Sequence, residues 1–133
     1  MSAVDTRFLS AGRQTRLGVF PVRRLGERLA IVSSSSRLDE ASARAYGRAV
    51  LRCVADGATE LVLDLSGVRH HAWPAVYALC ELEAHLIEAC CDPVAVAADE
   101  ILVRDLKAVG LERMWTLCAN VPAAVSGLLA RPV

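Results

Sequence analysis

Residues 61–65, Leu-Val-Leu-Asp-Leu, are the stretch of this sequence that most constrains its fold. Four of the five residues are apolar, and turn-forming residues lie on both sides of the run. A short apolar run bounded in this way is typical of a strand that helices cover on both faces of the sheet. The stretch therefore predicts a buried, central strand.

Strands and helices are expected to alternate along the rest of the chain. Further strands are predicted at residues 19–23, 29–32, 94–98 and 114–118, and helices at about 40–55, 74–90, 100–109 and 122–130. Asp39, Asp99 and Asn120 are the predicted N-caps of three of these helices, because a short polar side chain accepts hydrogen bonds from the free amides of the first turn. Short links between alternating strands and helices favour parallel strands joined by right-handed crossovers. The prediction is an α/β fold in the order ββαβαβαβα, with a mixed sheet that begins with a hairpin.

The length of 133 residues predicts one domain. Residues 1–17 show no sustained period and are expected to form a flexible lead-in, so that the domain proper covers residues 18–133. No apolar run approaches the ~20 residues that cross a bilayer, and no secretory signal is recognisable. The five cysteines are odd in number and lack a CxxC pair, which predicts reduced thiols in a cytoplasmic protein.

The charge pattern gives no sign of a nucleic-acid partner. Fifteen basic and fifteen acidic residues balance to a formal net charge of zero. Arg44, Arg48 and Arg52 recur every four residues on the helix predicted at 40–55. We interpret this row as a solvated face with Glu40 and Asp56 as ion-pair partners, and a basic docking stripe is the alternative.

No pattern typical of catalysis or of a cofactor occurs. A phosphate-binding loop needs clustered glycines before a helix, and none is present. His70 and His71 are neighbours in an extended segment, so their side chains are expected on opposite faces, which argues against a metal site. Glu81, Glu83 and Glu88 are expected on a solvated helix surface. The sequence thus predicts no enzyme, cofactor or metal, although a thiol enzyme that pairs Cys80 or Cys118 with a histidine stays open.

The informative segment runs from Asp64 to Ala75. In parallel α/β sheets, partners meet the carboxyl ends of the strands and the N-termini of the helices that follow. Trp73 is expected at the N-cap of the helix that starts here, where it offers no acceptor for the free amides. A large aromatic side chain at such a rim is either a packed lid or an interface anchor.

At this point the order of elements and three sequence phrases resemble a STAS domain, the fold shared by anti-sigma factor antagonists and the tails of sulphate transporters. The phrases are residues 38–43 (LDEASA), 61–68 (LVLDLSGV) and 106–114 (LKAVGLERM), and the resemblance covers roughly residues 18–130. It implies a protein that acts by binding other proteins.

The resemblance breaks down at the phosphorylation motif of the family. Members of the partner-switching cascade carry Asp-Ser-Ser-Gly at the start of the helix after the central strand, and an anti-sigma kinase phosphorylates the first serine. The unmodified form binds the kinase and frees the sigma factor, and the phosphorylated form dissociates. Aligned without gaps from Asp64, those positions hold Ala72, Trp73, Pro74 and Ala75. Phosphorylation at residue 73 is therefore chemically impossible.

The sequence and the resemblance together predict a degenerate anti-sigma factor antagonist that binds an anti-sigma factor or a related kinase-like protein, with no nucleic acid or membrane partner. Trp73 is the expected anchor, Arg37 and Arg69 are expected rim contacts, and the histidines are expected to make binding pH-sensitive, because histidine ordinarily titrates near ~6.5. The full set of expected contacts is Arg37, Asp39, Arg69, His70, His71, Ala72, Trp73 and Pro74.

Two alternatives stay open. In the first alternative, the domain is a sensor or scaffold module that forms a homodimer or binds a small apolar ligand under the second helix. Separately, the serines at residues 33–36, interpreted as a polar loop, are a weaker candidate for modification.

Overall fold

A six-stranded sheet with the strand order β1-β2-β3-β5-β7-β8 organises the computed structural model, which describes residues 13–130. Strands β1 to β3 pair antiparallel, and β3, β5, β7 and β8 pair parallel, which confirms the predicted mixed sheet. The strands are β1 (Arg13–Leu17), β2 (Phe20–Leu25), β3 (Leu29–Ser33), β5 (Glu60–Asp64), β7 (Val94–Ala97) and β8 (Thr116–Cys118).

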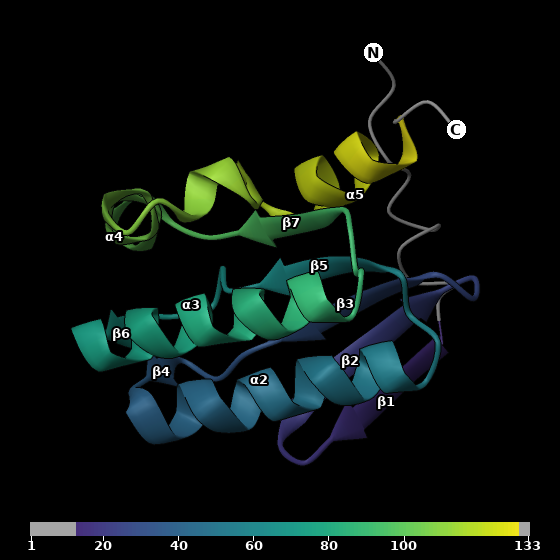
Figure 1. Cartoon of the computed structure of the whole chain (residues 1–133), viewed down its shortest axis with the longest axis horizontal. Helices are drawn as coiled ribbons and strands as arrows, with labels where there is room; N and C mark the ends of the chain where they lie inside the picture. The colour runs from purple at the N-terminus through teal and green to yellow at the C-terminus, as the bar shows by residue number, and fades with distance from the viewer. Residues whose placement is uncertain (1–12, 131–133) are drawn as a thin grey trace.

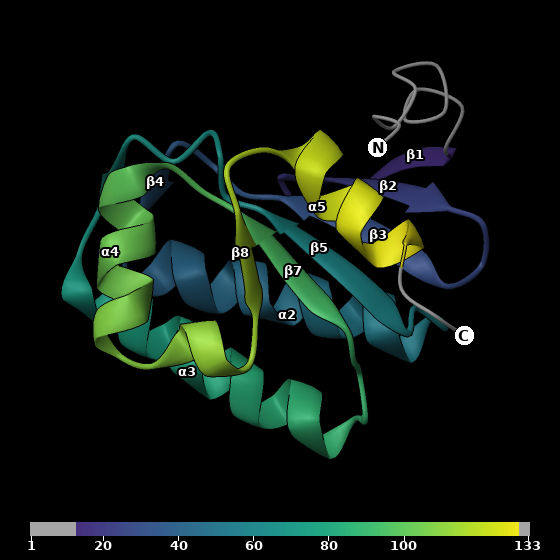
Figure 2. The ribbon, with the colours of Figure 1, turned by 90° about the horizontal axis from the view of Figure 1, so that it is seen from above.

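Helices cover both faces of this sheet (Figures 1 and 2). The long helices α2 and α3 pack side by side on one face, and α5 lies across the other. The helices are α2 (Glu40–Ala55), α3 (Trp73–Glu88), α4 (Glu100–Ala108) and α5 (Val121–Leu129), with a 3-10 turn at Leu111–Arg113. No helix within residues 13–130 is long and apolar enough to cross a membrane.

The predicted N-caps are confirmed. The side chains of Asp39, Asp99 and Asn120 accept hydrogen bonds at 2.8–2.9 Å from backbone amides in the first turns of α2, α4 and α5. Helix α2 has the predicted bounds. The buried face of α2 includes Ala43, Tyr46 and Gly47, while Ala41 is exposed.

The predicted lead-in is wrong for residues 13–17, which form β1. This strand pairs with β2 along its whole length, from Arg13 opposite Arg24 to Leu17 opposite Phe20. Its sequence, RQTRL, lacks an apolar alternation because β1 is an edge strand with little buried surface. Residues 1–12 of the predicted lead-in lie outside the described residues.

The core between the sheet and α3 contains a polar contact that corrects another expectation. Trp115 is 2% exposed, and its indole Nε1 donates a hydrogen bond to Glu83 Oε1 at 3.0 Å. Glu83 is therefore buried and not part of a solvated helix surface. Burial raises the pKa of the Glu83 carboxyl, and the indole bond partly offsets that rise.

The end of α3 also differs from prediction. The helix ends at Glu88, and Cys90 is exposed with a positive φ of 57°, so it does not continue the apolar face of the helix. Cys53 and Cys91 are buried, as expected for small apolar side chains.

Candidate functional site

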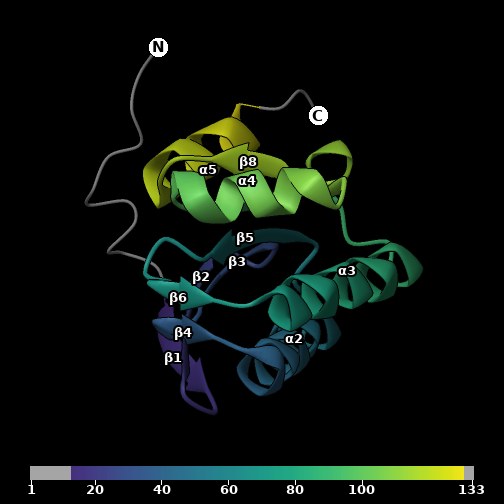
Figure 3. The ribbon, with the colours of Figure 1, turned by 90° about the vertical axis from the view of Figure 1, so that its left-hand side faces the viewer.

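Two short strands bring the predicted contact segments together at the end of the sheet where the parallel strands terminate. Strand β4 (Arg37–Leu38) pairs parallel with β6 (His70–His71), as Figure 3 shows. The Arg69 amide donates to the Ser36 carbonyl at 2.7 Å, and the Ala72 amide donates to the Leu38 carbonyl at 3.2 Å. Sequence reasoning missed both strands because a two-residue strand has no detectable period. Ser33, predicted to begin the polar loop, is the last residue of β3, and serines 34–36 lead directly into the β4–β6 pair.

We call the surface formed by β4, β6 and the first two turns of α3 the β4–β6 rim. Most of its predicted contact residues are exposed, and His71 is partly buried. The exposed members are Arg37, Asp39, Arg69, His70, Ala72, Trp73 and Pro74. The Asp39 carboxylate already accepts the Ser42 amide of α2, and this bond holds its pKa below the ordinary value. Asp39 thus shapes the rim as the cap of α2.

Trp73 is the first residue of α3, and Ala72 occupies the N-cap position, one residue earlier than predicted. Ala72 makes no side-chain bond to the first turn of the helix. Trp73 is half-buried, with 46% of its surface exposed to solvent. The indole is therefore not sealed inside the protein, and its role as an interface anchor stays a prediction.

Tyr77 is the site residue that sequence reasoning missed. It lies one turn after Trp73 and is 58% exposed, and the two ring centroids are 6.1 Å apart with planes tilted by 32°. The signal that reveals the pair is the spacing of four residues, which places both rings on one helix face. The rim therefore carries two adjacent, exposed aromatic side chains.

His71 links the rim to α4. Its Nε2 lies 2.7 Å from Asp105 Oδ2, and the two side chains are 12% and 14% exposed. His70, its neighbour in β6, is exposed, as expected when consecutive side chains of a strand alternate between faces. The bond to His71 holds the pKa of the Asp105 carboxyl below its ordinary value, and the nearby Arg104 guanidinium acts in the same direction.

This pair predicts a specific response to acid. A carboxyl whose pKa is lowered by folding contributes stability that is complete above the unfolded pKa of about 4 and is lost as the pH falls through the folded pKa. Asp105→Asn is therefore expected to lower the unfolding free energy at pH 7 and to flatten its decline in acid. Urea unfolding at a series of pH values between neutral and strongly acidic measures both effects. Parallel pH profiles for Asp105→Asn and the unsubstituted chain would contradict this account.

The described residues offer little for catalysis. Burial raises the pKa of the Cys80 and Cys118 thiols, which disfavours the thiolate that a cysteine nucleophile requires. Within residues 13–130, no group of three or more His, Cys, Asp or Glu side chains is placed to hold a metal ion.

Comparison with known proteins gives matches in structure. No family model and no curated protein matches the sequence. An anti-sigma factor antagonist from Mycobacterium paratuberculosis superposes with a TM-score of 0.70 at 23% identity, over 84% of this chain and 93% of that one. The anti-sigma factor antagonist SpoIIAA in its unphosphorylated form gives 0.63 at 11% identity, over 85% and 100%.

Part of a much longer anion transporter chain shares the same fold. The murine anion transporter Slc26a9 superposes with a TM-score of 0.63 at 18% identity, over 82% of this chain and 19% of the transporter chain. The chain thus has the STAS fold of anti-sigma factor antagonists, which confirms the predicted fold and the resemblance on which it was based.

Proposed function

We propose that this chain is a non-catalytic STAS protein that acts in the cytoplasm and regulates an anti-sigma factor, or a related kinase-like protein, by binding it through the β4–β6 rim. The observation that carries the proposal is the exposed pair of Trp73 and Tyr77 at the start of α3. Tryptophan and tyrosine are the residue types that most often dominate the binding energy of protein interfaces. Water-exposed aromatic faces of this size gain free energy when a partner covers them.

Charges around the aromatic pair support the same assignment. Arg37 and Arg69 are exposed at β4 and just before β6, close to the start of α3. Basic side chains at an interface rim raise the rate of encounter with an acidic partner surface more than they raise the final affinity. We therefore propose an acidic patch on the partner that faces the β4–β6 rim.

The proposal includes the loss of one regulatory step. SpoIIAA, which shares this fold, has been seen in unphosphorylated and phosphorylated forms. A phosphate adds about −1.5 to −2 charges at neutral pH, and such a charge inside a packed interface opposes binding. Trp73 has no hydroxyl group, so the complex formed by this chain is not dissociated by phosphorylation at that position.

A binding experiment with ATP tests this step. The chain is immobilised, a kinase-type anti-sigma factor is bound, and Mg-ATP is added while dissociation and mass are followed. We expect no phosphate on residues 72–75 and no faster dissociation. An antagonist that carries the Asp-Ser-Ser-Gly motif is the control, and it should be released.

Two results would count against the proposal. Release of this chain by ATP, with phosphate located by mass spectrometry on residues 33–36, would place the switch in the serine loop. A stable homodimer that Trp73→Ala dissociates, together with no binding to any anti-sigma factor, would favour the self-associating scaffold.

A further inference from the structure

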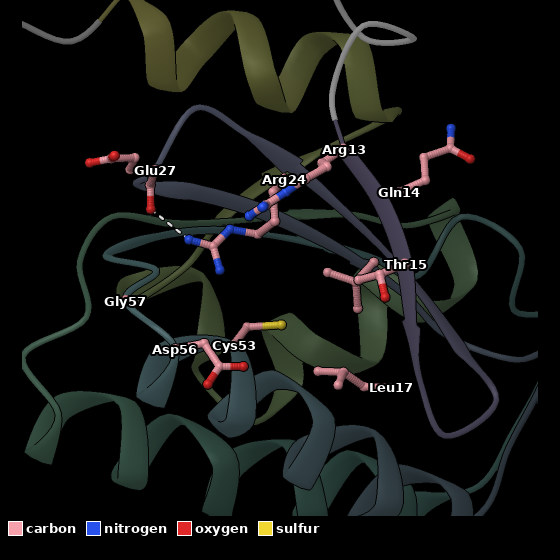
Figure 4. A pocket seen from close by; sticks show the side chains of 10 residues that line it. Arg13, Gln14, Thr15, Leu17, Arg24, Glu27, Cys53, Asp56 and Gly57 are labelled. Atoms are coloured by element: carbon pink, nitrogen blue, oxygen red, sulfur yellow. Dashed lines mark hydrogen bonds between the residues drawn. The ribbon is translucent and has the colours of Figure 1, made fainter.

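A cavity of about 730 Å³ lies between the β1–β2 hairpin and the C-terminal end of α2 (Figure 4). Its volume is within the range of small-molecule sites. It is separate from the β4–β6 rim, because the rim adjoins the start of α2 and the sixteen residues of this helix span about 24 Å. The function proposed above makes no use of this cavity.

The pairing of β1 with β2 aims two arginines into the cavity. Arg13 stands directly opposite Arg24 in the antiparallel register, and Thr15 stands opposite Val22 two residues along on the same face. Figure 4 shows both arginine side chains on the cavity side of the hairpin. Like charges at directly opposed positions destabilise a strand pair. An anion bound between the two guanidinium groups removes that repulsion.

The described residues provide no carboxylate for these two arginines. Within residues 13–130, no carboxylate oxygen lies within 4 Å of either guanidinium group. Glu27 offers its backbone oxygen to Arg24 Nη2 at 2.5 Å, while its carboxylate points away from the cavity (Figure 4). Asp56 pairs with Arg52 at 3.5 Å. Arg24 Nε is buried and finds no hydrogen-bond partner among the residues that the structure describes.

Beside the arginines the cavity wall is partly apolar and partly polar, since Gln14 and Thr15 line it as well. Leu17 and Val22 contribute aliphatic surface, and Figure 4 shows the Cys53 sulfur facing the cavity. Burial raises the pKa of the Cys53 thiol, so it stays neutral and behaves as a small apolar group. The acidic residues Glu27 and Asp56 also line the cavity, and they disfavour a doubly charged ligand over a singly charged one.

We propose that this cavity binds a small organic carboxylate with an apolar body. The carboxylate binds Arg13 and Arg24, because the planar guanidinium group matches its two oxygens. The apolar body packs against Leu17, Val22 and Cys53. The competing explanation is that the arginines serve as counter-charges for the carbonyl end of the α2 dipole.

Titration of the full chain with octanoate tests the proposal, followed by amide chemical shifts and by calorimetry. We expect saturable binding, with shifts concentrated at Thr15, Val22, Cys53 and Gly57, and a melting temperature that rises with octanoate concentration. Octanol and inorganic phosphate should each bind at least about tenfold more weakly, since one lacks the charge and the other the apolar body.

Matched variants test whether the octanoate carboxylate binds Arg13 and Arg24. Arg13→Gln and Arg24→Gln are expected to weaken octanoate binding by at least about tenfold. Arg16→Gln is the control, because Arg16 lies in the same strand on the opposite face, and its affinity should be unchanged. If Arg24→Gln does not fold, Arg13→Gln decides alone, since Arg13 is exposed on an edge strand.

Three outcomes would overturn the proposal. Absence of saturable octanoate binding would favour the competing explanation, in which the arginines are counter-charges for the carbonyl end of the α2 dipole. Equal loss of affinity in Arg16→Gln and Arg13→Gln would show unspecific attraction to the basic hairpin. Phosphate binding as tight as octanoate binding would show that the cavity does not require a ligand with an apolar body.

Discussion

Trp115→Ala is expected to lower the unfolding free energy by about 3–5 kcal/mol, the usual effect of removing a large aromatic side chain from a core. Trp115 is 2% exposed, so its replacement leaves a cavity between the sheet and α3. The change also removes the indole donor from Glu83 Oε1, and a buried carboxylate without its hydrogen-bond partner is unfavourable. A domain of this size has a total stability of about 5–15 kcal/mol, so this loss is a large fraction of the total.

Urea unfolding followed by circular dichroism measures this loss. Trp73→Ala is the matched control, because the same residue type is removed from a site that is 46% exposed. We expect this control to change the unfolding free energy by less than about 1 kcal/mol. Similar losses for the two tryptophan variants would contradict the placement of one indole in the core and the other in solvent.

Trp73→Ala is expected to have a large effect on partner binding, in contrast to its small effect on the unfolding free energy. Loss of an interface anchor reduces affinity by at least about 30-fold, which corresponds to the roughly 2 kcal/mol that defines a hot spot. Tyr77→Ala should weaken binding as well, and the double variant should lose less than the sum of the two, because the rings are adjacent. Calorimetric titration of an anti-sigma factor into each variant measures these affinities. Additive losses would show that the two rings contact the partner independently.

Much of the fold could be predicted because its signals are local. Asp39 caps α2 and Gly57 follows its end with a positive φ, so both limits of this helix are encoded in neighbouring residues. The apolar run at residues 61–65 gave the central strand for the same reason. Strand β1 was missed because an exposed edge strand has no apolar alternation to detect.

The candidate site could be predicted in position but not in its contacts. The loop after the central strand was identified from topology, whereas the β4–β6 pair depends on backbone bonds between segments more than thirty residues apart. His71 and Asp105 are 34 positions apart, and so no local pattern relates them. Glu83 was placed at the surface because helix periodicity cannot reveal that Trp115 covers it.

The most direct test of the central claim compares two exposed apolar side chains of α3 in one binding experiment. Trp73→Ala and Ile87→Ala remove side chains that are 46% and 56% exposed, the first at the β4–β6 rim and the second in the last turn of the helix. Each variant is titrated with the anti-sigma factors of the organism that encodes the chain. The account predicts that Ile87→Ala binds like the unsubstituted chain and that Trp73→Ala loses at least about 30-fold in affinity. Unchanged affinity in Trp73→Ala, or an equal loss in both variants, would contradict it.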